Sequence, residues 1–236
     1  MSAKGWVVAI DGPAGSGKST VARALARRLG AEHLETGAMY RAVALAALRR
    51  GENLHDAASL RQVVLELPAD VEEWWHAGAG SASGEELRSA EVDAVVSTVA
   101  SFPEVREELV RRQVEWVRAR GQGVVEGRDI GSVVLPDADL KVFLDASDEV
   151  RTGRRAREME RSGAHGDPTK LLERDRLDSS RSNSPLKVAE GALVIDTTQK
   201  TVDETVDEVL MLLDELAGAR ASGGASAASP QERLRP

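Results

Sequence analysis

The chain has 236 residues, of which 42% are hydrophobic and 30% charged, a composition typical of a globular protein with a substantial core. The net charge of -8 argues against a nucleic-acid-binding protein, and the absence of cysteine excludes disulfides, thiol catalysis and zinc–thiolate sites. No apolar run approaches the roughly 18 residues of a transmembrane helix, and no signal peptide is visible, so we expect a cytoplasmic protein without membrane contact.

Short apolar runs and helical periodicity alternate along the chain. Runs rich in valine, leucine and isoleucine predict strands at 6–11, 123–126, 140–144 and 193–195, and residues 32–35 predict a weaker strand. Apolar spacing with N-cap, glycine and proline signals predicts helices at 18–29, 37–50, 56–67, 91–100, 103–120, 148–161, 169–180 and 202–216. Strands separated by helical crossovers predict a three-layer α/β fold, in which helices cover both faces of a five-stranded parallel sheet.

Two segments depart from this alternation. Residues 69–84 contain Trp74-Trp75 followed by glycines and serines, and they predict a flexible insertion. Residues 217–236 are rich in alanine, glycine, serine, arginine and proline, and they predict a disordered tail. We therefore expect one folded domain over residues 1–216.

A phosphate-binding motif follows the first predicted strand. Residues 12–19 match G-x-x-x-x-G-K-[ST] and precede a predicted helix, which is the required context. Loop N–H groups and the helix N-terminus would bind phosphates, Lys18 would reach the outer phosphates and the Ser19 hydroxyl would ligate Mg²⁺. The predicted ATP-binding residues are Gly12, Pro13, Ala14, Gly15, Ser16, Gly17, Lys18, Ser19 and Thr20.

The motif alone leaves several enzyme classes open. The chain lacks Asn-Lys-x-Asp, which argues against a GTPase. Asp145 and Asp196 end apolar strands but lack the following glutamate that motor ATPases usually carry, and Asp145 is better explained as a loop residue or a cap of the next helix. A regulatory or motor ATPase, or a kinase of another small acceptor such as UMP, AMP or shikimate, stays an alternative.

Most arginines of the chain are explained as residues on solvent-exposed helix faces, but two are not. Arg128 follows the strand at 123–126, and Arg41 ends the segment Thr36–Arg41. We expect both to lie at the sheet edge where open α/β folds bind ligands, and arginine is suited to binding phosphate through two parallel hydrogen bonds.

Taken together, these segments resemble the bacterial cytidylate kinases. The resemblance runs from about Val7 to Leu213 and rests on Ile10–Thr20, Glu35–Arg41, Ser83–Arg88, Phe102–Arg106, Arg111–Gln113, Gly127–Gly131, Arg174–Asp178, Arg181 and Pro185–Leu186. It implies a P-loop nucleoside monophosphate kinase with an enlarged monophosphate-binding insert, about 63–101, and a short lid, about 151–167. The implied reaction converts ATP and CMP or dCMP to ADP and CDP or dCDP with Mg²⁺, in a monomer.

The resemblance also implies roles for individual residues. The implied catalytic residues are Lys18, Arg128, Arg154, Arg155 and Arg181. The implied CMP-binding residues are Thr36, Arg41, Ser97, Arg106, Arg128, Asp129, Arg174 and Asp178. Among them Asp129 would accept a hydrogen bond from the cytosine amine and Arg106 would donate to the ring. On spacing alone, Ser97 is equally an ordinary helix hydroxyl and Asp129 is alternatively an ion-pair partner.

Overall fold

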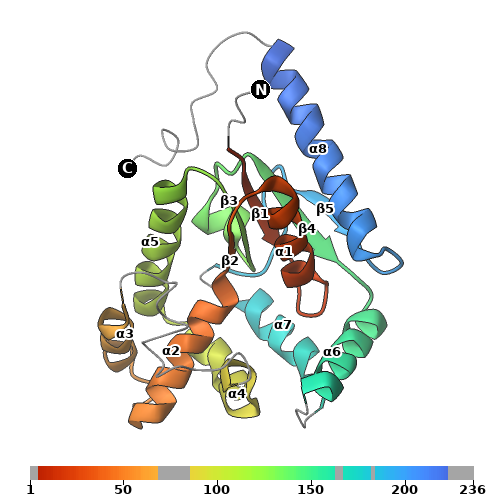
Figure 1. The fold of residues 1–236 in the computed structure, drawn as a ribbon. Coiled ribbons are helices and arrows are strands. Elements are labelled where there is room, and N and C mark those ends of the chain that lie inside the picture. Colours follow the sequence, from red (N-terminus) through yellow and green to blue (C-terminus); the bar gives the residue numbers. More distant parts are fainter. Residues whose placement is uncertain (1–4, 69–85, 163–166, 182–183, 223–236) are drawn as a thin grey trace. The chain divides into compact units, whose positions relative to one another are not determined.

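The computed structural model describes residues 5–68, 86–162, 167–181 and 184–222 (Figure 1). The chain forms two compact units, the first made of Met1–Leu34, Val117–Arg151 and Leu186–Pro236, and the second of Glu35–Trp116 and Thr152–Pro185. No helix within the described ranges is both long and apolar enough to cross a bilayer. The insertion predicted at 69–84 lies outside the described residues.

The first unit is built on a sheet in the order β2-β3-β1-β4-β5. The strands are β1 (Val7–Asp11), β2 (His33–Glu35), β3 (Gly123–Gly127), β4 (Leu140–Asp145) and β5 (Leu193–Asp196). β1 pairs in parallel with β3 and β4, and β4 pairs in parallel with β5. The predicted α/β fold with a five-stranded parallel sheet is confirmed, and the carboxyl ends of the paired strands meet at one edge.

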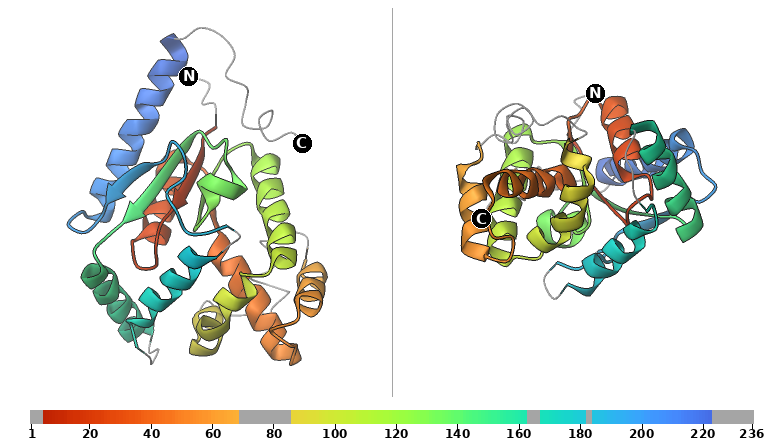
Figure 2. Two further views of the ribbon diagram at one scale, coloured as in Figure 1. Left: turned by 180° about the vertical axis from the view of Figure 1, so that it is seen from behind. Right: turned by 90° about the horizontal axis from the view of Figure 1, so that it is seen from below.

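One face of this sheet is covered by α1 (Lys18–Leu29) and α8 (Val202–Ser222), as Figures 1 and 2 show. Side chains alternate along a strand, so Val8 and Ile10 of β1 face these helices together and are fully buried. Each such side chain contributes about 1.5–3 kcal/mol by leaving water. This packing fixes α1, and with it the loop that precedes α1.

The C-terminal helix corrects one prediction. α8 continues to Ser222, six residues past the predicted end, so the prediction of disorder is wrong for residues 217–222. Arg220 explains the difference: it pairs with the fully buried carboxylate of Asp139 and lies 4.2 Å from the ring centroid of Trp6. Residues 223–236 of the predicted tail lie outside the described residues.

Matched truncations test this contact. We expect a chain ending at Ala217 to unfold with a free energy about 1–3 kcal/mol smaller than a chain ending at Ser222, because the Asp139 carboxylate loses its arginine. In a domain of this size that loss lowers the melting temperature by several degrees. Arg220→Ala in the full chain should reproduce most of the difference; equal melting of the two truncated chains would contradict it.

The second unit is helical. Its elements are α2 (Thr36–Arg50), α3 (Ala57–Glu66), η2 (Glu86–Arg88), α4 (Ala90–Val99), α5 (Pro103–Arg120), α6 (Asp148–Ser162) and α7 (Lys170–Ser180). Two of these helices are divided between the units: α5 belongs to the second unit up to Trp116, and α6 belongs to it from Thr152 onward. The ends of its six α-helices fall within one residue of prediction. Asp56 caps α3 by accepting hydrogen bonds from the amides of Ala58 and Ser59. The short helix η2 and the π-helical turn η3 (Ile130–Val134) of the first unit were not predicted.

Candidate active site

The loop at residues 12–17 joins β1 to α1 in a conformation that requires glycine. A Cβ atom at Gly12 would lie 2.0 Å from the carbonyl oxygen of Leu144. Gly15 has φ +75°, and a Cβ atom there would lie 2.8 Å from the carbonyl oxygen of Arg151. The first turn of α1 carries no acidic residue, so no carboxylate competes there for the positive helix end. The loop can therefore receive an anionic ligand.

Three cationic side chains of the first unit contact this loop. Lys18, 9% exposed, donates from Nζ to the carbonyl oxygen of Pro13 at 2.7 Å. Arg128 donates to the carbonyl oxygen of Gly12 at 2.8 Å. Arg151 donates to another loop carbonyl at 2.9 Å. These charges make the loop electropositive, which favours phosphate.

A hydroxyl and a buried carboxylate lie beside the loop. Ser19 donates from Oγ to Glu126 Oε2 at 3.0 Å, and Glu126 Oε1 lies 3.3 Å from His33 Nε2. Burial raises the pKa of Glu126, but the contact with His33 and the charge of Lys18 outweigh it and hold that pKa below its ordinary value. An ionised carboxylate and a hydroxyl are oxygen donors of the kind that Mg²⁺ takes.

Asp11 fixes the turn that follows β3. Its two carboxylate oxygens accept the amide hydrogens of Ile130 at 2.7 Å and Gly131 at 2.8 Å. The same turn begins at Asp129, which is 5% exposed. Burial raises the pKa of Asp11 to about 6, although the two amides lower it. Asp11 thus positions the backbone that carries Asp129.

The raised pKa of Asp11 predicts a pH-dependent contribution to stability. Its folded value of about 6 exceeds the ordinary 3.8, so the stability that protonation contributes is present at low pH and is lost as the pH rises through about 6. The side chain of Asp11→Asn is neutral at every pH. The free energy of unfolding of the variant, relative to that of wild type, should therefore increase by roughly 2–4 kcal/mol between about pH 4 and about pH 7. Urea unfolding of both proteins at the two pH values measures this gain. A difference independent of pH would contradict the assignment.

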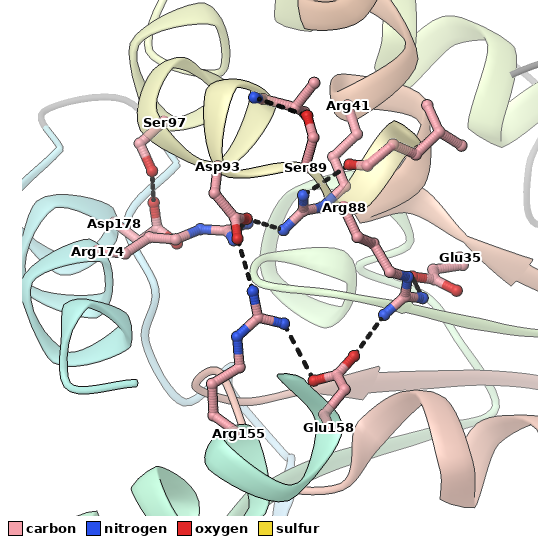
Figure 3. A network of polar contacts seen from close by, with 12 residues as sticks. Glu35, Arg41, Arg88, Ser89, Asp93, Ser97, Arg155, Glu158, Arg174 and Asp178 are labelled. Carbon is pink, nitrogen blue, oxygen red and sulfur yellow. Dashed lines mark hydrogen bonds and ion pairs between the residues drawn. The ribbon is translucent and has the colours of Figure 1, made fainter. Parts of the chain in front are cut away.

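In the second unit, three arginines from three helices contact one carboxylate, that of Asp93 in α4 (Figure 3). Arg41 of α2 lies 2.5 Å from Oδ1, Arg155 of α6 lies 2.6 Å from Oδ2, and Arg174 of α7 lies 3.5 Å from Oδ1. We call Arg41, Arg155 and Arg174 the arginine cluster. The structure therefore brings together three of the arginines that were predicted from the sequence.

A second set of ion pairs adjoins the cluster (Figure 3). Arg88 of η2 contacts Glu35 at 2.9 Å and Glu158 of α6 at 3.0 Å. Glu158 also contacts Arg155 at 3.1 Å. Two ion-pair routes thus connect the α6 residues of this unit with its η2–α4 segment, one through Asp93 and one through Glu158.

Three other predicted residues meet at the end of α7. Asp178, 2% exposed, accepts a hydrogen bond from Ser97 Oγ at 3.3 Å and pairs with Arg181. Arg181 also donates to the carbonyl oxygen of Ser97 at 3.4 Å. The hydroxyl of Ser97 therefore contacts a buried carboxylate.

The remaining predicted residues occupy separate positions. Arg106, 4% exposed, lies 5.5 Å from the ring centroid of Tyr40, and Thr36 begins α2 at 3% exposure. Arg154 lies on α6, where burial and the neighbouring Arg157 lower its pKa. Arg128 and Asp129 belong to the first unit, whereas Arg41 and Arg106 belong to the second.

Comparison with known proteins decides the family. The model of the Cytidylate kinase family matches residues 8–215. The chain belongs to the cytidylate kinase family. The cytidylate kinase of Mycobacterium leprae is 45% identical over 90% of this chain and 97% of its own length. The cytidylate kinase of Rhodococcus opacus is 41% identical over 92% of this chain and 99% of its own length. That of Shouchella clausii is 44% identical over 90% of this chain and 98% of its own length.

Membership in the cytidylate kinase family confirms the resemblance drawn from the motifs and makes the chain an enzyme, a nucleotide kinase with ATP as co-substrate. Several polar residues of its candidate site were not predicted from the sequence. Glu126 could have been found, because it stands at a strand end directly before Gly127-Arg128-Asp129. Asp93 and Glu158 belong to no motif, and only the folded helices bring them to the arginines. Arg88 ends the segment Ser83–Arg88, which carries the resemblance, but no role was predicted for it.

Proposed function

We propose that this enzyme transfers the γ-phosphoryl group of ATP to CMP or dCMP, giving ADP and CDP or dCDP. The observation that carries the proposal is the phosphate loop of the first unit, with three cations on its carbonyl oxygens, in a chain whose family is cytidylate kinase. Phosphoryl transfer needs little covalent chemistry from protein, so the residues act by positioning substrates, compensating charge and excluding water.

The phosphate loop is the proposed ATP site. Backbone N–H groups of residues 12–20, apart from Pro13, which has none, would bind the phosphates, and Lys18 would turn from the Pro13 carbonyl to the outer phosphates. Ser16 Oγ, which is buried without a hydrogen-bond partner among the described residues, is a further donor for an anion in this loop. In this role Lys18 would compensate the charge that develops during transfer.

The donors beside the loop fit Mg²⁺. Ser19 Oγ and the ionised carboxylate of Glu126 are 3.0 Å apart and are hard oxygen ligands. No group of three or more histidine, aspartate or glutamate side chains in the described ranges could hold a metal alone, so phosphate oxygens and water would complete the shell. Bound there, Mg²⁺ would neutralise phosphate charge.

The acceptor CMP would be held through its phosphate, sugar and base. We assign its phosphate to Arg41 and Arg128, and its sugar and nearby atoms to Arg174 and Asp178. Arg154, Arg155 and Arg181 would compensate charge on the transferred group. The lowered pKa of Arg154 supports a partly desolvated guanidinium, where each charge–charge contact is stronger.

The base would be selected by hydrogen-bond polarity. Asp129 would accept from the cytosine amine, Arg106 would donate to N3 and O2, and Ser97 and Thr36 would complete the site. Burial supports this assignment, because Asp129 is 5% and Arg106 4% exposed, and a desolvated polar group discriminates strongly between partners.

Residues of about 151–167 would act as a lid that excludes water once both nucleotides are bound, which prevents wasteful ATP hydrolysis. The insert of about 63–101 would contact CMP, within one kinase domain over 1–216. We further propose a cytoplasmic monomer whose partners are ATP, CMP and dCMP, without nucleic acid or membrane.

A panel of acceptors tests the proposal. ADP release is measured with CMP, dCMP, UMP, AMP and no acceptor, with and without Mg²⁺. CMP and dCMP should support turnover far above the others, and turnover should require Mg²⁺. Equal ADP release without any monophosphate would contradict the transfer and would favour a plain ATPase.

A further inference from the structure

Asp93 contacts the guanidinium donors of the arginine cluster that a phosphate would need. Its Oδ1 contacts Arg41 at 2.5 Å and Arg174 at 3.5 Å, and its Oδ2 contacts Arg155 at 2.6 Å (Figure 3). Both oxygens of one carboxylate are thereby occupied by guanidinium donors. A nucleotide phosphate that binds Arg41 must take over the guanidinium donor that now contacts Asp93 Oδ1.

Asp93 contacts three arginines with one carboxylate. Three permanent positive charges face it, and Arg155 also contacts the carboxylate of Glu158. Arg41 is the most buried, with 10% of its side chain exposed, and its other amino group donates to the carbonyl oxygen of Leu87 at 2.8 Å. Its orientation is therefore fixed by the backbone, and Asp93 is the exchangeable partner.

We infer that Asp93 is an internal competitor of the acceptor's phosphate for Arg41, the arginine of the cluster that is assigned above to that phosphate. This inference rests on the proposed function. A phosphate monoester carries a charge of about -1.5 to -2 and three terminal oxygens, against one charge and two oxygens for Asp93, so it displaces the carboxylate. The nucleotide must nevertheless break contacts that the protein has already made, which weakens its binding.

The competition weakens the binding of CMP and of a free phosphate ion by the same factor. A free phosphate ion meets the same carboxylate and gains nothing from residues that contact the sugar or base. CMP offsets the lost contacts with its nucleoside.

The variant Asp93→Asn removes the charge of residue 93 and keeps the shape of its side chain. Glu91→Gln is the matched control, because Glu91 is an exposed acid in the same first turn of α4. Dissociation constants for CMP, cytidine and inorganic phosphate are measured by calorimetry for wild type and both variants. We expect Asp93→Asn to bind CMP and inorganic phosphate about tenfold more tightly, the factor for about 1.4 kcal/mol, and cytidine within about twofold of wild type.

Glu91→Gln should leave all three constants near wild type. If Asp93→Asn binds CMP equally or more weakly, or if it strengthens cytidine as much as CMP, the inference is wrong and Asp93 positions the arginines instead. A failure of the proposed function is distinct, because wild type would then transfer no phosphoryl group to CMP.

A second measurement needs no variant that could misfold. The side-chain carboxyl ¹³C resonance of Asp93 in the wild-type chain is followed during titration with CMP and, separately, with cytidine. A change with CMP but not with cytidine shows that the carboxylate gives up Arg41 to a phosphate. An unchanged resonance at saturating CMP overturns the inference.

Discussion

Lys18→Ala is expected to lower kcat by about 10²–10³ while the protein stays folded, the range typical of a lost charge-stabilising group. Lys18 lies in the phosphate loop with its ammonium 2.7 Å from the Pro13 carbonyl oxygen, so the loop keeps this charge beside the proposed phosphates. Without it, negative charge that moves onto the leaving ADP is less compensated. Steady-state turnover with saturating ATP and CMP measures the loss, and circular dichroism reports the fold.

Two variants make this result specific. Lys18→Met keeps the aliphatic stem and should lose as much activity as the alanine variant. Lys141→Ala is the matched control, because Lys141 also donates to a backbone carbonyl, that of Glu190 at 3.2 Å, but at an exposed site. It should turn over close to wild type. Near-normal turnover of a well-folded Lys18→Ala would show that the loop does not carry out the transfer.

The sequence is most informative about the first unit, because its features are local. An apolar run, a glycine-rich loop and a helix with apolar spacing each depend on neighbouring residues, so β1, the loop and α1 could be predicted with their boundaries. The glycines at 12 and 15 are required by close backbone contacts that the motif encodes. Parallel pairing of the strands then follows from the helical crossovers.

The polar network of the second unit could not be predicted, because it depends on tertiary contacts. Asp93 and Arg155 are 62 residues apart and meet only when α4 and α6 are folded. Nothing in the sequence near Asp93 distinguishes it from an ordinary first-turn acid such as Glu91. Long side chains of arginine reach across helices, so spacing along the chain does not predict which carboxylate they contact.

The end of α8 was misjudged for a related reason. An alanine-rich segment is compatible with a helix as well as with a disordered tail, and local composition does not separate the two. The deciding contacts are distant in sequence, since Arg220 pairs with Asp139 and stacks on Trp6. Predicting that helix end would have required knowledge of the fold of β1 and β4.

Asp129→Ala is expected to lower kcat/KM for CMP roughly ten- to 150-fold, which corresponds to about 1.5–3 kcal/mol of lost transition-state stabilisation. The loss of kcat/KM for UMP should be much smaller. With CMP the variant loses a charge-assisted hydrogen bond from the cytosine amine. With UMP it loses a repulsion, because uracil presents a carbonyl oxygen at that position. The measurement is kcat/KM for both nucleotides with wild type and variant.

Two further variants separate base selection from a structural role. Asp129→Asn keeps the shape of the side chain, and its amide can donate to the uracil carbonyl, so the preference for CMP over UMP should shrink further than in the alanine variant. Arg106→Ala should weaken both nucleotides, since both bases offer O2 as an acceptor.

The turn after β3 gives a control for the loss of the Asp129 charge. Its carboxylate raises the pKa of Asp11, so Asp129→Ala should lower that pKa whether or not the base is read there. A lowered pKa of Asp11 together with equal losses for CMP and UMP would mean that Asp129 shapes the electrostatics of the turn and does not select the base. A lowered pKa together with unequal losses supports base selection.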